Sequence, residues 1–139
     1  MVDRDIIIAK ADSIRKHVQK AREKVGIDLK DFLRDADCQD IVLFNIQMAA
    51  QNCIDMAAHI ISDEGYGVPG SNNEMFYMLE KHGLLDRDLT EKLVKAVGFR
   101  NLIVHEYGQL DMTQVYRTAQ KDITDLEDYI KAIITKLEI

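Results

Sequence analysis

Four kinds of side chain that can act together on a phosphodiester lie close together in the last third of the chain. A permanent cation, an amide, an imidazole that titrates near neutrality and a phenol occur at Arg100, Asn101, His105 and Tyr107. An imidazole can move a proton, a guanidinium can neutralise a pentavalent phosphorane, and an amide can orient the phosphate. These residue types therefore suit cleavage of RNA by attack of its own 2′-hydroxyl, a reaction that requires no metal and no other cofactor.

A helix is expected to position the first three of these residues. Arg100 falls in the centre of an apolar helical face, while Asn101 and His105 are four residues apart and so are neighbours near the helix end. Arg100 and His105 are separated by about 140° around an ideal helix. They can converge on a substrate at the helix end, or with a second copy of the chain, but they cannot face each other directly. The apolar face is expected to contain Leu89, Leu93, Ala96, Val97, Ile103 and Val104.

Arg100 also has a purely structural explanation. An arginine among core positions is costly to bury unless a carboxylate pairs with it. Asp55 or Asp12 could supply that carboxylate in an internal ion pair. His105 would then be only a favourable positive charge at a helix C-terminus.

The overall composition predicts one folded domain over residues 1–139. The chain is 47% hydrophobic and 30% charged, with one Pro and no Trp, which is ordinary for a globular protein and unlike a turn-rich sandwich or barrel. No apolar run reaches the length of a membrane span, and the first residues lack the pattern of a signal peptide. The two cysteines, Cys38 and Cys53, are expected to be free and reduced, and the protein is expected in the cytoplasm. The histidines show no metal-ligand spacing.

The charge is distributed unevenly along the chain. The net charge of −6 counts against a protein that coats DNA, and no DNA partner is expected. Residues 1–25 nevertheless carry seven basic and four acidic side chains. This excess is either a solvated helix rim or a phosphate-facing edge. The basic residues flank the apolar seam of the first helix, with Lys10, His17 and Lys24 on one side and Arg4, Arg15 and Arg22 on the other.

Apolar residues recur at steps of three and four in every long segment, and no stretch alternates as a strand would. The pattern predicts an all-α, up-and-down helical bundle of five to six helices in a single domain. Asp28, Asp37, Asn72 or Asn73, Asp86 or Asp88, and Asp111 or Thr113 are the expected helix N-caps. The expected helices cover about residues 2–25, 28–34, 38–62, 74–82 and 89–104, with a last helix from 111 or 113, and residues 64–73 form a loop.

The helix over 38–62 carries more apolar surface than one neighbour can cover. Ile41, Phe44 and Met48 lie away from its main apolar stripe, and a second subunit is a natural partner for them. A third side of this helix carries Asn45, Asn52 and His59, seven residues apart each time. They are expected to line either a wet cleft or a solvent-exposed stripe.

The pattern Arg-x4-His-x-Tyr, with Asn directly after the Arg, in a small acidic all-helical chain resembles the HEPN superfamily and specifically the HepT toxins. The resemblance extends over essentially the whole chain and implies a metal-independent ribonuclease that acts as a homodimer, with two motifs facing one cleft. Arg100 and His105 would be the catalytic pair, and Asn101 would support phosphate binding. Tyr107 would be the tyrosine that a partner antitoxin, a minimal nucleotidyltransferase of the MntA type, modifies with AMP.

Two other functional classes fit the same residues. The Arg100–His105 region could bind a nucleotide or anchor a nucleotidyltransferase without catalysing anything. The chain could also be a purely structural dimer. Cleavage of RNA that depends on both residues would separate the first hypothesis from these two.

Overall fold

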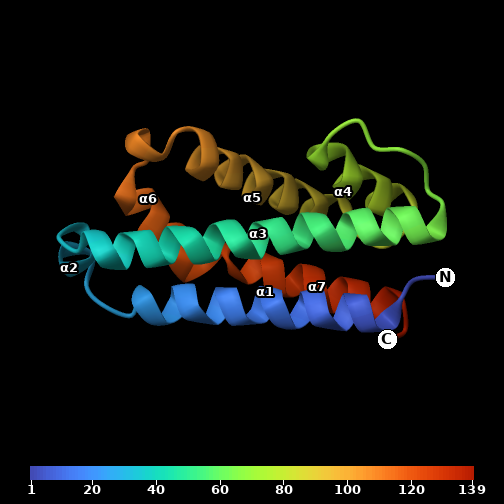
Figure 1. The fold of residues 1–139 in the computed structure, drawn as a ribbon, viewed down its shortest axis with the longest axis horizontal. Helices are drawn as coiled ribbons and strands as arrows, with labels where there is room; N and C mark the ends of the chain where they lie inside the picture. Colours follow the sequence, from blue (N-terminus) through green and yellow to red (C-terminus); the bar gives the residue numbers. More distant parts are fainter.

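Helices joined by short connections account for nearly the whole chain in the computed structural model, which describes residues 1–139 (Figure 1). No strand is present, so the all-α prediction is confirmed. The elements are α1 (Arg4–Lys24), α2 (Leu29–Leu33), α3 (Ala36–Glu64), α4 (Asn72–Lys81), α5 (Arg87–His105), the 3₁₀ turn η1 (Tyr107–Gln109), α6 (Met112–Arg117), the π-helical segment η2 (Thr118–Asp122) and α7 (Thr124–Lys136).

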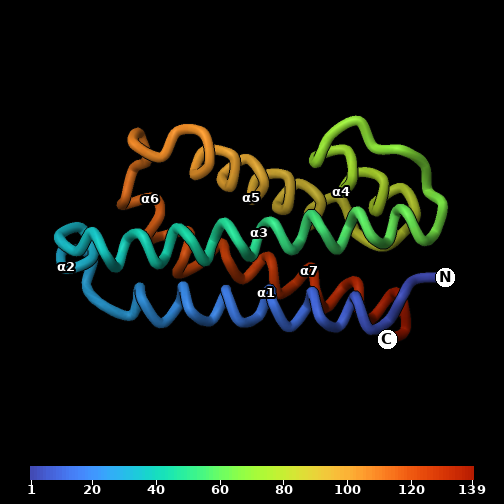
Figure 2. Tube along the Cα trace, viewed as in Figure 1, coloured from blue at the N-terminus to red at the C-terminus, as the bar shows by residue number.

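The long helices run up and down, as predicted. Figure 2 shows α1 antiparallel to α3, α3 antiparallel to α5, and the last helix returning beside α1 toward the end where the chain started. The two termini therefore lie at one end of the bundle. The last turns of α1, the short helix α2 and the end of α5 lie at the other end (Figure 1). None of the helices combines the length and apolar character needed to cross a membrane.

A continuous hydrophobic core joins α1, α3 and the other helices. The seam of α1 is buried at each step of three or four residues, because side chains at this spacing share one helical face. Cys38 and Cys53 are buried and free, as predicted. The seam residues of α1 that are fully buried are Ile7, Ala11, Ile14, Val18 and Ala21.

Two predicted helix caps are wrong by one or two residues. The Asp35 side chain, not that of Asp37, accepts the hydrogen bond that starts α3, from the Cys38 N–H at 3.0 Å. The Ser71 hydroxyl, not an Asn, accepts from the Glu74 N–H at the start of α4. In both segments several residues of the capping types are adjacent, so composition alone does not select among them.

The last helix is not regular α-helix throughout. The Ile123 N–H donates to the Thr118 carbonyl, five residues back, at 3.0 Å, which is the hydrogen-bond step of a π-helix. Apolar residues at steps of three and four stay buried through this segment and on both sides of it, at Val115, Ala119, Ile123, Leu126, Ile130 and Ile133. A wider turn changes the rotation per residue only locally, so the apolar spacing gave no sign of it.

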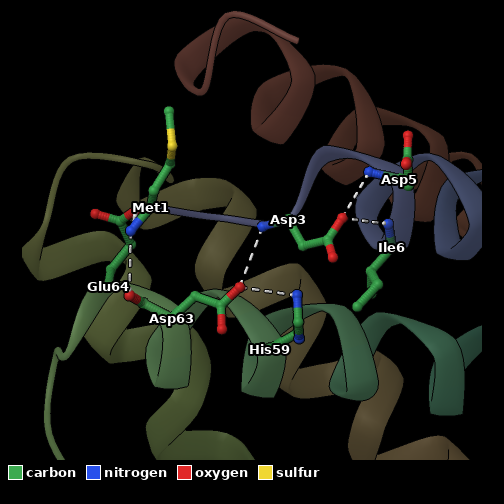
Figure 3. A network of polar contacts seen from close by, with 7 residues as sticks. All are labelled: Met1, Asp3, Asp5, Ile6, His59, Asp63 and Glu64. Atoms are coloured by element: carbon green, nitrogen blue, oxygen red, sulfur yellow. Dashed lines mark hydrogen bonds and ion pairs between the residues drawn. The ribbon is translucent and has the colours of Figure 1, made fainter.

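The predicted polar stripe of α3 is mostly buried, and its first residue, Asn45, lines a surface hollow between α1 and α3. Asn45 and Asn52 are buried, and each side-chain amide donates to the backbone carbonyl four residues earlier, at 2.7 and 2.8 Å. His59 lies 2.9 Å from the Asp63 carboxylate, which also accepts the backbone N–H of Asp3 (Figure 3). The amides of Asn45 and Asn52 are thus satisfied within α3, and Asp63 ties the N-terminal segment to this helix.

Tyr129 of α7 supplies the longest-range buried hydrogen bond to α3. Its ring is fully buried, and its hydroxyl donates to the Cys53 carbonyl at 3.0 Å. Burial raises the pKa of Tyr129 well above its ordinary value, so the hydroxyl keeps its proton and continues to donate.

Replacing Tyr129 by Phe should lower the free energy of unfolding by about 1–2 kcal/mol, because a buried carbonyl loses a hydrogen bond. Urea denaturation followed by circular dichroism measures this change. Tyr77→Phe is the matched control, since the Tyr77 side chain is exposed and should leave stability unchanged. Equal stability of Tyr129→Phe and wild type would show that this bond contributes nothing.

Candidate active site

The end of α5 carries three of the four residues selected from the sequence. Arg100 and Asn101 are half-buried, and His105 is exposed as the last residue of the helix. The apolar face beside them is buried at Leu93, Val97 and Ile103, as predicted. Val104 is 41% exposed, so its assignment to that face was wrong: the last turn of α5 buries only the adjacent Ile103.

Arg100 has no carboxylate partner. Its Nη1 donates to the Asn101 side-chain oxygen at 2.9 Å, and its buried Nε has no hydrogen-bond partner. The two acids considered as its partners are engaged elsewhere, Asp55 with Lys10 at 3.5 Å and Asp12 with Arg15 at 3.4 Å. The internal ion pair is therefore absent, and the guanidinium charge remains available to an anion.

His105 stands apart from Arg100. Neither a hydrogen bond nor an ion pair joins the two side chains, in agreement with their separation around the helix. The imidazole is exposed at the C-terminal end of α5. The two side chains could therefore act together only through a ligand that reaches both of them.

Tyr107 follows α5 in the 3₁₀ turn η1 and returns to α3. Its hydroxyl donates a hydrogen bond to the Asp40 carboxylate, while the ring stays 50% exposed. This hydrogen bond, assisted by partial burial and by the negative charge of Asp40, raises the pKa of Tyr107. Sequence reasoning missed Asp40, which lies 67 positions away and is one of 24 acidic residues.

Replacing Asp40 by Asn should lower the pKa of Tyr107 toward its ordinary value of about 10, because the carboxylate stabilises the protonated phenol. NMR of isotope-labelled tyrosine across an alkaline titration measures the change, with Tyr107→Phe identifying the signal. Asp37→Asn, a neighbouring exposed acid, is the control. An unchanged titration in the Asp40 variant would contradict the hydrogen bond.

The site is not a deep pocket. A cavity between α3, α5 and the last helix contains Phe99 but none of the four selected residues. Arg100, His105 and Tyr107 instead lie at the open end of α5, where a long polymer can reach them.

The family model described as "Ribonuclease HepT-like" matches residues 14–133, most of the chain. This chain belongs to the HepT-like ribonuclease family. The HepT resemblance drawn from the segment Arg100–Tyr107 is thereby confirmed. The roles of the individual residues remain predictions.

Relatives in this family are named for different RNA substrates. An mRNA nuclease HepT of Shewanella oneidensis is 34% identical over 129 residues, which cover 93% of this chain and 96% of the relative. A tRNA nuclease HepT of Aphanizomenon flos-aquae is 28% identical over 128 residues, covering 92% and 87% of the two chains. The HepT-like fold is thus found in proteins named for two classes of RNA.

A solved structure is similar over almost its whole length. It is described as the tri-AMPylated Shewanella oneidensis HEPN toxin in complex with an MNT antitoxin, with a TM-score of 0.88 and 33% identity over 96% of this chain and 99% of that one. This HepT-like chain therefore has the same helical arrangement as that toxin. The toxin's structure contains AMP modifications and the antitoxin as its partner.

Proposed function

We propose that this protein is an RNA endonuclease that acts in the cytoplasm as the toxin of a HepT/MntA-type toxin–antitoxin pair. Arg100 and His105 are the proposed catalytic residues, and Asn101 orients the phosphate. The observation that carries the proposal is the unpaired guanidinium of Arg100, held by Asn101 at the helix end where His105 is exposed. A guanidinium without a carboxylate partner can bind the phosphate of a phosphodiester, and an imidazole on the same helix end can transfer a proton.

The proposed reaction is an internal transfer within RNA. The 2′-oxygen attacks the adjacent phosphorus while the bond from phosphorus to the 5′-oxygen breaks. The 2′-hydroxyl loses its proton and the departing 5′-oxygen gains one; His105 carries one of these transfers and water carries the other. Arg100 neutralises the charge that develops on the phosphorane. The products are a 2′,3′-cyclic phosphate end and a free 5′-hydroxyl end.

The purified chain, free of any partner, should cleave RNA in the presence of EDTA. Mass spectrometry of the fragments should find 2′,3′-cyclic phosphate ends. A substrate with 2′-deoxy sugars is the matched control and should stay intact, because it lacks the attacking oxygen. Binding of RNA or ATP without turnover would instead support a non-catalytic binding module.

Tyr107 is the proposed site of regulation by the antitoxin. It is exposed, lies two residues after His105, and projects from a short turn rather than from the core. Transfer of AMP from ATP would join the phenol oxygen to the α-phosphorus, with pyrophosphate leaving. The added phosphate and adenosine then lie beside His105, where they repel and obstruct an RNA backbone.

A homodimer is the proposed assembly. Leu102 near the end of α5 is a large apolar side chain that is 42% exposed. A two-fold interface over this part of α5 would remove it from water. Sedimentation of the Leu102→Glu variant would test this, with a monomer as the expected result.

A further inference from the structure

We propose that Lys16, Lys20 and Lys24 form a track for the phosphate backbone of single-stranded RNA, which leads the strand to Arg100 and His105. This inference rests on the proposed nuclease function. It assigns a substrate-binding role to the excess positive charge of the first helix, which the reaction itself does not use.

Six of the seven lysines and arginines of α1 fall into two groups in the folded protein; the seventh, Arg4, is exposed without an ion pair at the first turn of the helix, outside the hollow described below. Lys10, Arg15 and Arg22 are ion-paired, with Asp55, Asp12 and Glu127 respectively. Lys16, Lys20 and Lys24 are exposed, and none has a carboxylate oxygen within 4 Å. The fold thus neutralises one group and leaves the other free.

The three free lysines share one surface hollow between α1 and α3. They are four residues apart, so they rise along one side of α1 in steps of about 6 Å. His17, Asp40, Ile41, Phe44 and Asn45 complete the lining of this hollow.

The other polar side chains in the hollow each have a hydrogen-bond partner. The His17 Nδ1 lies 2.8 Å from the Asn45 side-chain oxygen, and the Asp40 carboxylate accepts the hydrogen bond from Tyr107. The lysine ammonium groups are therefore the groups in the hollow that still lack a partner. Phosphates in a row are the natural ligand for ammonium groups in a row.

Asp40 connects the hollow to the candidate active site. It lines the hollow together with the lysines, and it binds Tyr107, which follows His105 by two residues. The last turns of α1 and the end of α5 lie at the same end of the bundle (Figure 1). A strand that follows the lysines toward Asp40 therefore approaches the catalytic residues.

The positive charge of the three lysines favours an anionic polymer as the ligand of the hollow. The whole chain has a net charge of −6, so RNA is repelled by most of its surface. An unpaired basic row gives the strand one favourable approach, whose strength falls as salt screens it. An acidic protein surface could use the same charges, and the experiment below separates it from RNA.

The test compares two triple variants, both built on His105→Ala so that binding is measured without cleavage. One carries Lys16→Gln, Lys20→Gln and Lys24→Gln. The matched control replaces three exposed lysines that have no ion pair and lie outside the hollow, so both variants lose the same formal charge. The control lysines are Lys81, Lys131 and Lys136.

Fluorescence anisotropy with a labelled single-stranded RNA, over a range of salt concentrations, measures the affinity. Loss of three phosphate contacts should reduce the slope of log K against log salt by about 2. Affinity at low salt should fall at least tenfold in the track variant and much less in the control. Thermal melting and sedimentation establish that both variants keep the fold and the assembly.

Three outcomes would overturn the inference. These are unchanged RNA affinity in the track variant, an equal loss in both variants, and loss of nucleotidyltransferase binding with RNA binding intact. The nuclease proposal is judged separately, by cleavage with wild-type His105. If wild type cleaves RNA and the track variant binds it normally, only the track is wrong; if RNA binds along the track and wild type never cleaves, the nuclease proposal is wrong.

Discussion

Replacing His105 by Ala should slow RNA cleavage by about 10²- to 10⁴-fold, the usual contribution of a general acid or base. Replacing Arg100 by Ala should slow it by about 10²- to 10³-fold, because the charge on the phosphorane loses its stabilising donor. Arg100→Lys should also be impaired, since an ammonium group cannot present the planar fork of a guanidinium. Single-turnover cleavage in EDTA measures these rates.

The control for this series is Glu106→Gln, which changes an exposed residue between His105 and Tyr107 and should leave the rate within a few-fold of wild type. Circular dichroism checks that each variant is folded. Equal cleavage by wild type and by both alanine variants would reject the catalytic assignment, because the activity would then belong to a contaminant.

The second large effect is expected at Tyr107. Incubation with the cognate nucleotidyltransferase and ATP should add the mass of AMP at this residue and reduce cleavage at least a hundredfold. Tyr107→Phe should remain an active nuclease, should gain no mass, and should no longer be silenced. Intact-mass spectrometry and the cleavage assay, run on the same samples, measure both parts.

Modification of Tyr107 should also disturb its contact with Asp40. The modified oxygen has no proton, so it can no longer donate to Asp40, and its new phosphate and the Asp40 carboxylate repel each other. The turn η1 must then leave its position against α3. Hydrogen exchange of residues 106–111 should therefore become faster after modification.

Tyr77 provides the matched control for modification, because it is an exposed tyrosine on another helix, with 38% of its surface accessible. Tyr77→Phe should be modified and silenced like wild type. If Tyr107→Phe still gains the mass of AMP, the modification site has been assigned wrongly.

The sequence predicts this fold well because one rule governs each helix. Apolar residues at steps of three and four fix the buried face regardless of what covers it, and the residues of α1 at this spacing, from Ile7 to Ala21, are all buried. The cap at Asp35 and the π segment at Thr118–Asp122 were missed. Several residues of the capping types lie next to each other at the start of α3, so the sequence did not single out Asp35. The π segment changes the backbone hydrogen bonds without changing the apolar pattern.

In the candidate site, too, local helical geometry was predictable from the sequence and contacts between distant helices were not. Arg100, Asn101, His105 and Tyr107 are close in sequence, and helical geometry alone places the first three. Asp40 reaches Tyr107 only through the packing of α5 on α3, which no local pattern encodes. Which acid pairs with which base is likewise a matter of packing: Asp55 pairs with Lys10 and Asp12 with Arg15, and neither pairs with Arg100.

The charge of the first helix shows why a residue count is insufficient. Its basic excess was evident from the sequence, and Lys10, His17 and Lys24 were expected on one edge. Arg22 is neutralised by Glu127, 105 positions away, and Lys10 by Asp55. Only the folded chain shows which ammonium groups are left without a partner.

Both chain ends lie at the end of the bundle opposite His105 and Tyr107 (Figure 1). A tag, fluorophore or tether attached to either end is therefore held far from the surface that would meet RNA and the nucleotidyltransferase. Immobilising the molecule through its termini would leave that surface facing the solution. Single-molecule measurements of cleavage and of its silencing could then be made on one anchored copy.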